Sequence, residues 1–423
     1  MKMALKMLKN TIKFSKWQRI KKFLVSHKEL LSLYGISALN AGIPIFIYFY
    51  LSKTISADEL AMLAMTEAIS VIIYSISMQG YDVIGVDLLK REQDGPKVFW
   101  SVIYARLGVF LLLVSIMAAI GHLAENGLIN NAMFWLPNII GNLLISQYYF
   151  QYKGRLASLL KWMLIGKALV ITYLIVRISK TTEFSEICLV IGVTNLLVAI
   201  VLLGLNVAKP VSIPVKHLLV LVRRSASHTF SNLGIAILKD INIIILGLFY
   251  PASSVIVNYA LAEKIIKGFQ FAIRPLNRIA MYKYVDARVG NDVLDLASLA
   301  VIVRTQFKHL TVILFFSYIF LAALGSYFLK FFEIEIVLYS LILAPSLFFG
   351  VYNYFYGPVF LGLRKNGAEY FYLVLCSALI YLPCLVSVLA YSKNYGIYLA
   401  YNLSEIILVL LIYIKIGKLR ISE

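Results

Sequence analysis

Long, nearly uncharged runs recur along this chain, and they constrain its fold more than any other feature of the sequence. Two examples are LGVFLLLVSIMAAI at 107–120 and ILVLLIYIKI at 407–416. The whole chain is 61% hydrophobic and 14% charged, whereas about one quarter of the residues in a typical soluble domain are charged. A soluble fold cannot bury this much apolar surface, so the sequence predicts an all-α, multi-pass integral membrane protein.

The spacing of the apolar runs predicts about twelve transmembrane helices, since a helix needs roughly 20 apolar residues to cross a bilayer. An even number of spans puts both termini on the same side of the membrane. We place the spans at 29–52, 58–84, 98–120, 130–150, 157–178, 184–206, 225–249, 255–279, 305–329, 336–362, 368–391 and 395–416.

The distribution of Lys and Arg sets the predicted orientation, because cytoplasmic loops are enriched in these residues. If the N-terminus is inside, the inner segments contain most of the Lys and Arg residues that lie outside the spans. The outer loops contain only Lys53, Arg177, Lys180, Lys330 and Lys393. Both termini are therefore predicted to be cytoplasmic, and much of the formal net charge of +19 reflects topology and not binding to nucleic acid.

Two six-helix bundles are predicted to follow a basic N-terminal segment. The segment at 1–28 has no apolar core after its first lysines, so it is not a cleavable signal peptide. It is either a basic helix on the anionic lipid surface of the bilayer or a disordered tail. The bundles at 29–206 and 219–423 flank a proline-containing linker, VAKPVSIPVKHL at 207–218, which is predicted to be cytoplasmic.

A short internal similarity supports the two halves. AMTEAI at 64–69, in the second span, resembles ALAEKI at 260–265, in the eighth. The match puts Glu67 and Glu263 at equivalent positions of a repeated unit. Transporters are often built from such repeats, with the binding site between them.

Patterns typical of metal, nucleotide and disulfide chemistry are missing from the sequence. It contains no HExxH, Walker A, GxGxxG or CxxC motif. Cys188, Cys376 and Cys384 fall in apolar segments, and we interpret them as small buried hydrophobic residues. The sequence predicts no cofactor.

Charged residues inside the predicted spans are the strongest functional signal. A charge at the bilayer centre costs at least about 2.5–3.5 kcal/mol, so such residues face a cavity or a partner and are candidates for function. Those that we take as candidates are the clear acids Glu67, Asp240, Glu263 and Glu405, and the bases Arg106, Lys161, Lys167, Lys239, Lys264, Lys267, Arg274 and Arg278.

Four of these cations form one stripe in the segment LAEKIIKGFQFAIRPLNRI at 261–279. At about 100° per residue, Lys264, Lys267, Arg274 and Arg278 fall within about 80° of one another. Lys264 and Lys267 are predicted near the midplane, and the two arginines near the cytoplasmic interface, where snorkelling to headgroups is the alternative.

The predicted partners of the two midplane lysines differ. Lys264 has Glu263 and Glu67 as candidates for a local ion pair. Lys267 is predicted to have no acid partner on its own helix, which favours a functional role for this lysine.

Two further spans contribute candidates. In the seventh span, His228 and Lys239 belong to one polar face, and Lys239 lies near mid-membrane beside Asp240. In the third span, Arg106 lies about two turns from the cytoplasmic side and either snorkels or faces the cavity. Bases outnumber acids within the spans, so the sequence predicts a net positive cavity lined by spans one, two, seven and eight. Such a cavity suits an anion, and a diphosphate suits it well, because Lys and Arg both bind phosphate oxygens.

With these features in place, the chain resembles the polysaccharide flippases, the Wzx-type O-antigen exporters of the multidrug/oligosaccharidyl-lipid/polysaccharide (MOP) superfamily. The resemblance covers most of the chain. It rests on SMQGYDVIGVDLLKRE at 77–92, QYYFQYKGRLASLLKW at 147–162, SHTFSNLGIAILKDINIIILGLFY at 227–250 and NYALAEKIIKGFQFAIRPLNRIAMY at 258–282.

The resemblance implies two six-helix bundles around a central cavity in a bacterial inner membrane. It also implies a transporter, not an enzyme, that flips an undecaprenyl diphosphate-linked oligosaccharide from the cytoplasmic to the periplasmic leaflet. The expected mechanism is alternating access driven by an ion gradient. A polysaccharide polymerase and a chain-length regulator are the implied protein partners.

We assign the candidate roles on this basis. Glu67, Asp240, Glu263 and His228 are candidates for binding a coupling proton or Na⁺, since carboxylates at this depth can titrate near neutrality. The candidate diphosphate ligands are Lys239, Lys264, Lys267, Arg274 and Arg106.

Two alternatives come from other classes. A cationic-drug antiporter of the same superfamily calls for a net acidic cavity, and the charge count of the spans favours the opposite sign. A membrane-embedded polysaccharide polymerase needs a substantial outer loop with catalytic residues, whereas the outer loops here are short, as in GHLAENGLIN at 121–130.

Overall fold

A computed structural model describes eleven stretches of the chain. They are 31–81, 85, 88–89, 94–123, 125–206, 209–250, 253–288, 296–328, 334–361, 368–392 and 396–422. The predicted basic segment at 1–28 lies outside the described residues.

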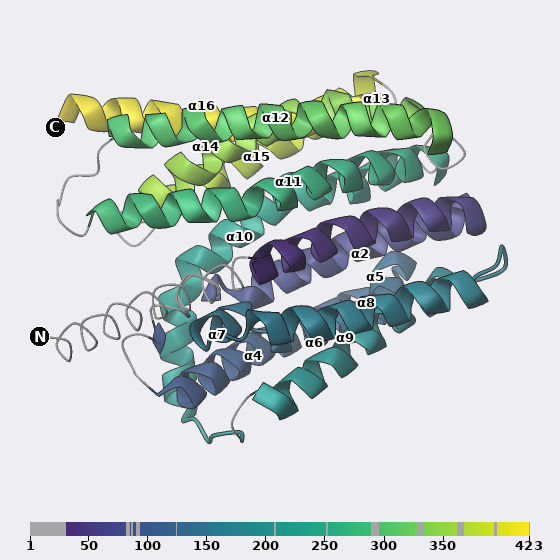
Figure 1. Ribbon diagram of the computed structural model, residues 1–423, viewed down its shortest axis with the longest axis horizontal. Coiled ribbons are helices and arrows are strands. Elements are labelled where there is room, and N and C mark those ends of the chain that lie inside the picture. The colour runs from purple at the N-terminus through teal and green to yellow at the C-terminus, as the bar shows by residue number, and fades with distance from the viewer. Residues whose placement is uncertain are drawn as a thin grey trace, which may run out of the picture.

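The described residues form helices and no strands (Figure 1). The first helix covers Leu31–Thr54. It is followed by α2 (Ala57–Met78), α4 (Gly95–Leu123), α5 (Gly127–Ala132), η1 (Met133–Trp135), α6 (Leu136–Leu144), α7 (Gln147–Tyr152), α8 (Leu156–Arg177), α9 (Phe184–Asn206), α10 (Val215–Phe249), α11 (Ser253–Arg288), α12 (Leu296–Phe328), α13 (Ile334–Leu343), α14 (Pro345–Tyr354), η2 (Phe355–Leu361), α15 (Ala368–Ser392) and α16 (Gly396–Ser422).

The chain is a multi-pass membrane protein, and the predicted fold class is confirmed. Within the described residues, 11 helices are long and apolar enough to cross a membrane. Helix α11, the eighth predicted span, is not among them, because its charged stripe lowers its hydropathy, yet it lies alongside the others (Figure 1).

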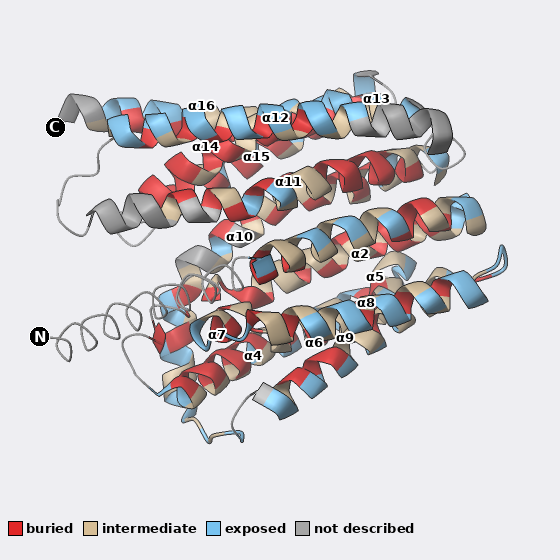
Figure 2. Ribbon diagram, in the orientation of Figure 1, coloured by how far each residue is buried: buried red, intermediate tan, exposed pale blue. Residues whose placement is uncertain are grey.

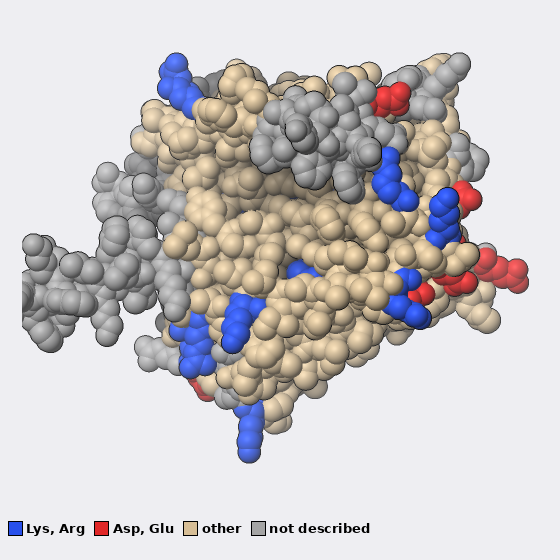
Figure 3. Space-filling view, turned by 45° about the vertical axis from the view of Figure 1, so that its right-hand side comes forward, with Lys and Arg blue, Asp and Glu red and all other residues tan. Residues whose placement is uncertain are grey.

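The surface of the molecule matches a lipid environment. Exposed Leu, Ile, Val and Phe side chains cover the outward faces of the helices, while the inward faces are buried (Figure 2). On the face shown in Figure 3, the charged side chains lie mainly toward the two ends, with a broad uncharged surface between them. In lipid, apolar residues on the outside need no protein partner, whereas polar groups must find one within the bundle.

The fourth predicted span, 130–150, is interrupted and not continuous. Pro137 lies in the first turn of α6, where its missing N–H costs nothing. Helix α6 then ends at Leu144, and α7 begins at Gln147 after two non-helical residues, Ile145 and Ser146. The break leaves backbone carbonyls at the end of α6 in need of a donor.

Helices α6 and α9 approach each other closely because glycines face the contact. A Cβ on Gly141 of α6 would lie 2.9 Å from backbone atoms of Asn195 and Leu196 in α9. A Cβ on Gly192 of α9 would lie 2.9 Å from the backbone N of Asn138 in α6. Small residues allow such close packing in membranes, where helices have no hydrophobic driving force between them.

Helices α2, α10 and α11 meet at the centre of the molecule. Helix α10 packs against α2 and α4 on one side and against α15 and α16 on the other, and α11 packs against α2, α12 and α13. The largest hydrophobic core contains fully buried residues of all three central helices, including Leu63, Leu246 and Ile266. Helix α10 begins at Val215, inside the predicted linker at 207–218. The division into two six-helix bundles stays a prediction.

Candidate functional site

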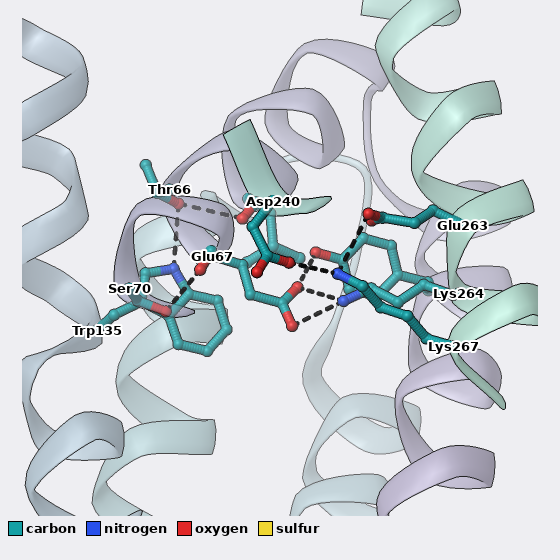
Figure 4. Close-up of polar contacts among 10 residues, drawn as sticks. Thr66, Glu67, Ser70, Trp135, Asp240, Glu263, Lys264 and Lys267 are labelled. Carbon is teal, nitrogen blue, oxygen red and sulfur yellow. Dashed lines mark hydrogen bonds and ion pairs between the residues drawn. The ribbon is translucent and has the colours of Figure 1, made fainter. Parts of the chain in front are cut away.

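Two lysines of α11 and three carboxylates of α2, α10 and α11 form a buried group of charges at this centre, which we call the lysine–carboxylate cluster (Figure 4). Its members are Glu67, Asp240, Glu263, Lys264 and Lys267. All of them lie on helices that pack against one another, so the cluster joins α2, α10 and α11 by charge as well as by apolar contact.

Lys264 pairs with Glu67 across the contact between α11 and α2. Its Nζ lies 2.7 Å from each carboxylate oxygen of Glu67. The Tyr48 hydroxyl donates a hydrogen bond to the same carboxylate, and the Lys264 ammonium lies 4.3 Å from the centre of the Tyr48 ring. Both partners of this pair are therefore held in place from the first helix as well.

Lys267 pairs with two acids at once. Its Nζ lies 2.8 Å from Asp240 Oδ1 on α10 and 3.2 Å from Glu263 Oε1 on its own helix. The prediction that Lys267 lacks an acid partner on its own helix is wrong, because Glu263 lies four residues earlier, and side chains at that spacing meet on a helix surface.

Residues around Glu67 fix the position of α2 within the cluster. Trp135 Nε1 donates to Thr66 Oγ1 at 3.1 Å, and Thr66 in turn donates to the backbone of its own helix (Figure 4). Ser70 donates to the Glu67 backbone carbonyl at 2.7 Å. Glu67 therefore projects from a helix turn that η1 holds on one side and α11 on the other.

The pairing within the cluster adds what the sequence analysis lacked. Three carboxylates contact two ammonium groups there. The count of bases and acids over all spans does not say which charges meet. A cavity of about 20 Å³ lies among these side chains, which is room for about one water molecule.

A third lysine, Lys239 of α10, pairs with an acid that the sequence analysis left without a role. Its Nζ lies 2.8 Å from Glu405 Oε1 on α16. Asn353 Nδ2 at the end of α14 donates to the Glu405 carboxylate and, at 3.3 Å, to its backbone carbonyl. The signal in the sequence was that Glu405 is the one remaining acid buried within the spans.

Lys239 also lines a second cavity, which we call the Arg274 cavity. It has a volume of about 360 Å³ and lies between α10, α11, α14, α15 and α16. Polar and aromatic side chains line it together, among them Lys239, Gln270, Phe271, Arg274, Asn277, Asn353, Tyr354 and Glu405.

Arg274 differs from the three lysines. Its guanidinium lies 5.6 Å from the centre of the Phe271 ring, and its side chain is exposed along the cavity. Among the described residues it has no carboxylate partner, whereas Lys239, Lys264 and Lys267 each have one or two. The structure thus brings Arg274 and Lys239 together at one cavity, and Lys264 and Lys267 at another.

Arg106 lines neither cavity, contrary to its predicted place among the diphosphate ligands. It is fully buried in α4. Its Nη1 donates to Ser146 Oγ at 3.0 Å and approaches the Leu143 carbonyl at 3.5 Å, while its guanidinium lies near the Tyr81 and Tyr148 rings. Arg106 therefore supplies the donor that the break between α6 and α7 requires.

The other predicted cations lie apart from both cavities or outside the description. Lys161 is exposed on α8 with its ammonium over the Trp162 ring, and Lys167 is half-buried two turns further along the same helix. The side chains of His228 and Arg278 lie outside the described residues. Where side chains are described, no three His, Cys, Asp or Glu residues are arranged to hold a metal ion.

Comparison with known proteins identifies the fold. No protein-family model matches the chain, and no curated protein matches it. Solved structures do match over nearly the whole length, and the fold is that of the transporters of the MOP superfamily. The structures reported below are all transporters.

Three of these structures show the range of the similarity. An inward-facing multidrug resistance MATE family transporter of the MOP superfamily is 12% identical, with a TM-score of 0.65 over 92% of this chain and 98% of that chain. An outward-facing transporter of the same description is 11% identical, with a TM-score of 0.53 over 94% and 95%. A MOP superfamily transporter from Pyrococcus furiosus, described as having a binding pocket of reverse polarity that suggests a different function, is 12% identical, with a TM-score of 0.50 over 93% and 95%.

Transporters with this fold have been solved in inward-facing and in outward-facing conformations. The TM-score is higher for the inward-facing structure than for the outward-facing one. These identities establish a common fold and leave the substrate to be argued from the site.

Proposed function

We propose that this protein flips a polyprenyl diphosphate-linked oligosaccharide from the cytoplasmic to the periplasmic leaflet by alternating access. The observation that carries the proposal is Arg274, a guanidinium without a carboxylate partner among the described residues, on the wall of an intramembrane cavity. An arginine at such a site is costly unless it faces water or an anion. Its forked donors match phosphate oxygens in geometry and charge.

The rest of the Arg274 cavity supports the same ligand class. Lys239 adds a second cation and Glu405 one carboxylate, so the cavity has an excess of one positive charge. A volume of about 360 Å³ lies at the lower end of the range for small-molecule sites, about 300–1,000 Å³. In this proposal the cavity holds the diphosphate and the adjoining sugar, while the prenyl tail stays in lipid.

The proposal changes the role of the two midplane lysines. Lys264 and Lys267 already have carboxylate partners, so we assign the first contact with the diphosphate to Arg274 and Lys239. Glu67, Asp240 and Glu263 remain candidates for binding the coupling proton or Na⁺. Binding a cation there would weaken the ion pairs between α11 and its neighbours, which is a route from ion binding to helix movement.

The proposed setting has two sources. The excess of Lys and Arg in one set of loops favours cytoplasmic termini, and the resemblance to the polysaccharide flippases implies a bacterial inner membrane. The description of the Pyrococcus furiosus transporter links the polarity of its pocket to its function, and we use polarity here in the same way to choose between substrates.

A second candidate function is export of organic cations. The lysine–carboxylate cluster favours it, because three acids face two lysines there. This candidate puts the substrate at Glu67, Asp240 and Glu263, and not at Arg274. The two candidates therefore predict opposite effects of the same substitutions.

Reconstituted vesicles test the two candidates directly. Purified protein is placed in liposomes that contain a labelled polyprenyl diphosphate disaccharide, and an impermeant glycosidase reports which leaflet exposes the sugar. We expect the protein to accelerate exchange between leaflets and Arg274→Ala to slow it by tenfold or more, with Lys161→Ala as a control cation on the lipid-facing helix α8. Exchange no faster than in protein-free liposomes would sink the proposal, and gradient-driven uptake of a cationic dye would favour the second candidate.

A further inference from the structure

Two asparagines of the Arg274 cavity have side-chain oxygens that lack a hydrogen-bond donor. Asn277 of α11 is 7% exposed and Asn353 of α14 is 4% exposed. Within the described residues, the Oδ1 atoms of both are buried without a partner, and both side chains line the cavity. Burying an acceptor unpaired costs free energy, so each position is suited to receive a donor from a ligand.

The orientation of the Asn353 amide follows from its other contacts. Its Nδ2 donates to both the carboxylate and the backbone carbonyl of Glu405. Turning the amide over would place Oδ1 against these two acceptors, so the network itself assigns the orientation. The Nδ2 of Asn353 is therefore used within the fold, and its Oδ1 is the atom left without a partner among the described residues.

The backbone around Asn353 keeps this part of the cavity open. Asn353 lies one residue before the end of α14, and the chain continues as η2, a π-helical stretch in which Pro358 also lines the cavity. Such π-helical stretches are frequent at functional sites. One turn before Asn353, a Cβ on Gly350 would meet only Glu405 Oε1, at 3.8 Å, so the glycine leaves open space beside the asparagine.

The polarity of the cavity limits which chemical groups of a ligand can donate a hydrogen bond to these acceptors. A phosphate or carboxylate oxygen cannot donate to Asn277 or Asn353, whereas an ammonium or a hydroxyl can. Lys239 and Arg274 on the same wall disfavour an ammonium. Neutral hydroxyls remain, and the rings of Phe271 and Tyr354 line the same space, which suits a sugar ring beside a phosphate.

We infer that Asn277 and Asn353 form the subsite for the first sugar of the substrate, the one attached to the diphosphate that Arg274 binds. This inference rests on the proposed function and deepens it, because it makes the asparagines specificity-determining residues for the glycan. Recognition of this kind discriminates well, since a ligand without the hydroxyl leaves the buried acceptors unpaired.

Binding of two lipid probes tests the subsite. The protein in lipid nanodiscs is titrated with undecaprenyl diphosphate and with the same lipid bearing one hexose. We expect Asn277→Ala and Asn353→Ala to weaken binding of the hexose-bearing lipid about tenfold and binding of the plain lipid less than about twofold. Arg274→Ala is expected to weaken both.

The variants are chosen so that misfolding and loss of recognition are separable. Within the described residues Asn277 makes no hydrogen bond of its own, so Asn277→Ala removes only the unpartnered amide. Asn402→Ala is the matched control, because Asn402 is a buried asparagine of α16 that also has an unpartnered Oδ1 and does not line the cavity.

The possible outcomes distinguish a failure of the sugar subsite from a failure of the proposed function. If the wild-type protein binds neither lipid, the proposed function fails. If it binds both lipids and the asparagine variants leave the hexose-bearing lipid unaffected, the diphosphate site stands and the sugar subsite is overturned. Equal weakening of both lipids by Asn277→Ala also overturns the subsite, because it assigns the residue to the fold and not to the sugar.

Discussion

Lys264 of α11 and Glu67 of α2 form an ion pair in which one ammonium contacts both carboxylate oxygens at 2.7 Å. The two residues are 197 positions apart in the sequence, and their helices belong to the two predicted halves of the molecule. Under the proposed alternating-access mechanism, the pair connects the two parts that move, and its stability bears on both folding and transport.

The pair predicts a specific pattern in a double-mutant cycle. Glu67→Gln leaves the Lys264 ammonium buried without its partner, and we expect a loss of about 2–3 kcal/mol, since removing one member of a buried pair exposes the other to the full desolvation cost. The double variant Glu67→Gln/Lys264→Met removes both charges and should regain most of that loss. Thermal unfolding in detergent is measured for Glu67→Gln, Lys264→Met and the double variant. A double variant no more stable than Glu67→Gln would show that the two charges do not interact in the folded protein.

The two contacts of Lys267 predict which variants of the cluster are the least stable. Lys267→Met leaves Asp240 and Glu263 facing each other without the ammonium that both contact, so we expect it to destabilise the protein more than Glu263→Gln, which leaves the ion pair with Asp240 in place. The difference is expected to exceed about 1.4 kcal/mol, or about tenfold in the unfolding equilibrium. Chemical unfolding of the two single variants gives the comparison, and the reverse order would contradict the bidentate arrangement.

The order of the helices was readable from the sequence, because apolar length is a local property. Some helix ends were not: the seventh span was predicted at 225–249, whereas α10 covers Val215–Phe249, because a helix can continue beyond its apolar part. The fourth span was less well predicted, since the break at Ser146 is stabilised by Arg106 of another helix, which no local pattern shows.

Sequence reasoning selected charges of the candidate site but not their pairing. Glu67, Asp240, Glu263, Lys264 and Lys267 were selected because a charge is costly in lipid, and they meet in one cluster. The pair between Lys267 and Glu263 was readable from their spacing, whereas those of Glu67 with Lys264 and of Lys239 with Glu405 depend on which helices pack together. A sum of charges over the spans does not show which of them meet.

Arg274 predicts a loss of transport without a loss of stability. Its side chain is exposed and has no acid partner among the described residues, so Arg274→Ala should change the free energy of unfolding by no more than about 0.5 kcal/mol. Arg274→Lys should retain part of the transport rate, because a lysine keeps the charge and loses the forked geometry. Leaflet exchange and thermal unfolding are measured on the same preparations. Full transport by Arg274→Ala would remove the anion site from this cavity.

For Arg106 we expect the opposite result, a loss of stability without a loss of ligand binding. Arg106→Met leaves Ser146 and the Leu143 carbonyl without their donor and removes a cation from between two tyrosine rings, and we expect a loss of about 2–4 kcal/mol. Affinity for undecaprenyl diphosphate should stay within twofold, because Arg106 lines neither cavity. An unchanged melting temperature together with a large fall in affinity would return Arg106 to the binding site.

A substitution of Gly141 tests how closely α6 and α9 pack. Gly141→Ala places a Cβ 2.9 Å from backbone atoms of Asn195 and Leu196, and backbone cannot yield as a flexible side chain does, so we expect a loss of about 1–3 kcal/mol. The control is Gly204→Ala in the partner helix α9, where the added Cβ has nothing within 4 Å. This variant should be neutral or stabilising by up to about 1 kcal/mol, because alanine has the better helix propensity. Both variants are compared by thermal unfolding in the same detergent. If Gly141→Ala is as stable as Gly204→Ala, the two helices lie further apart than this structure places them.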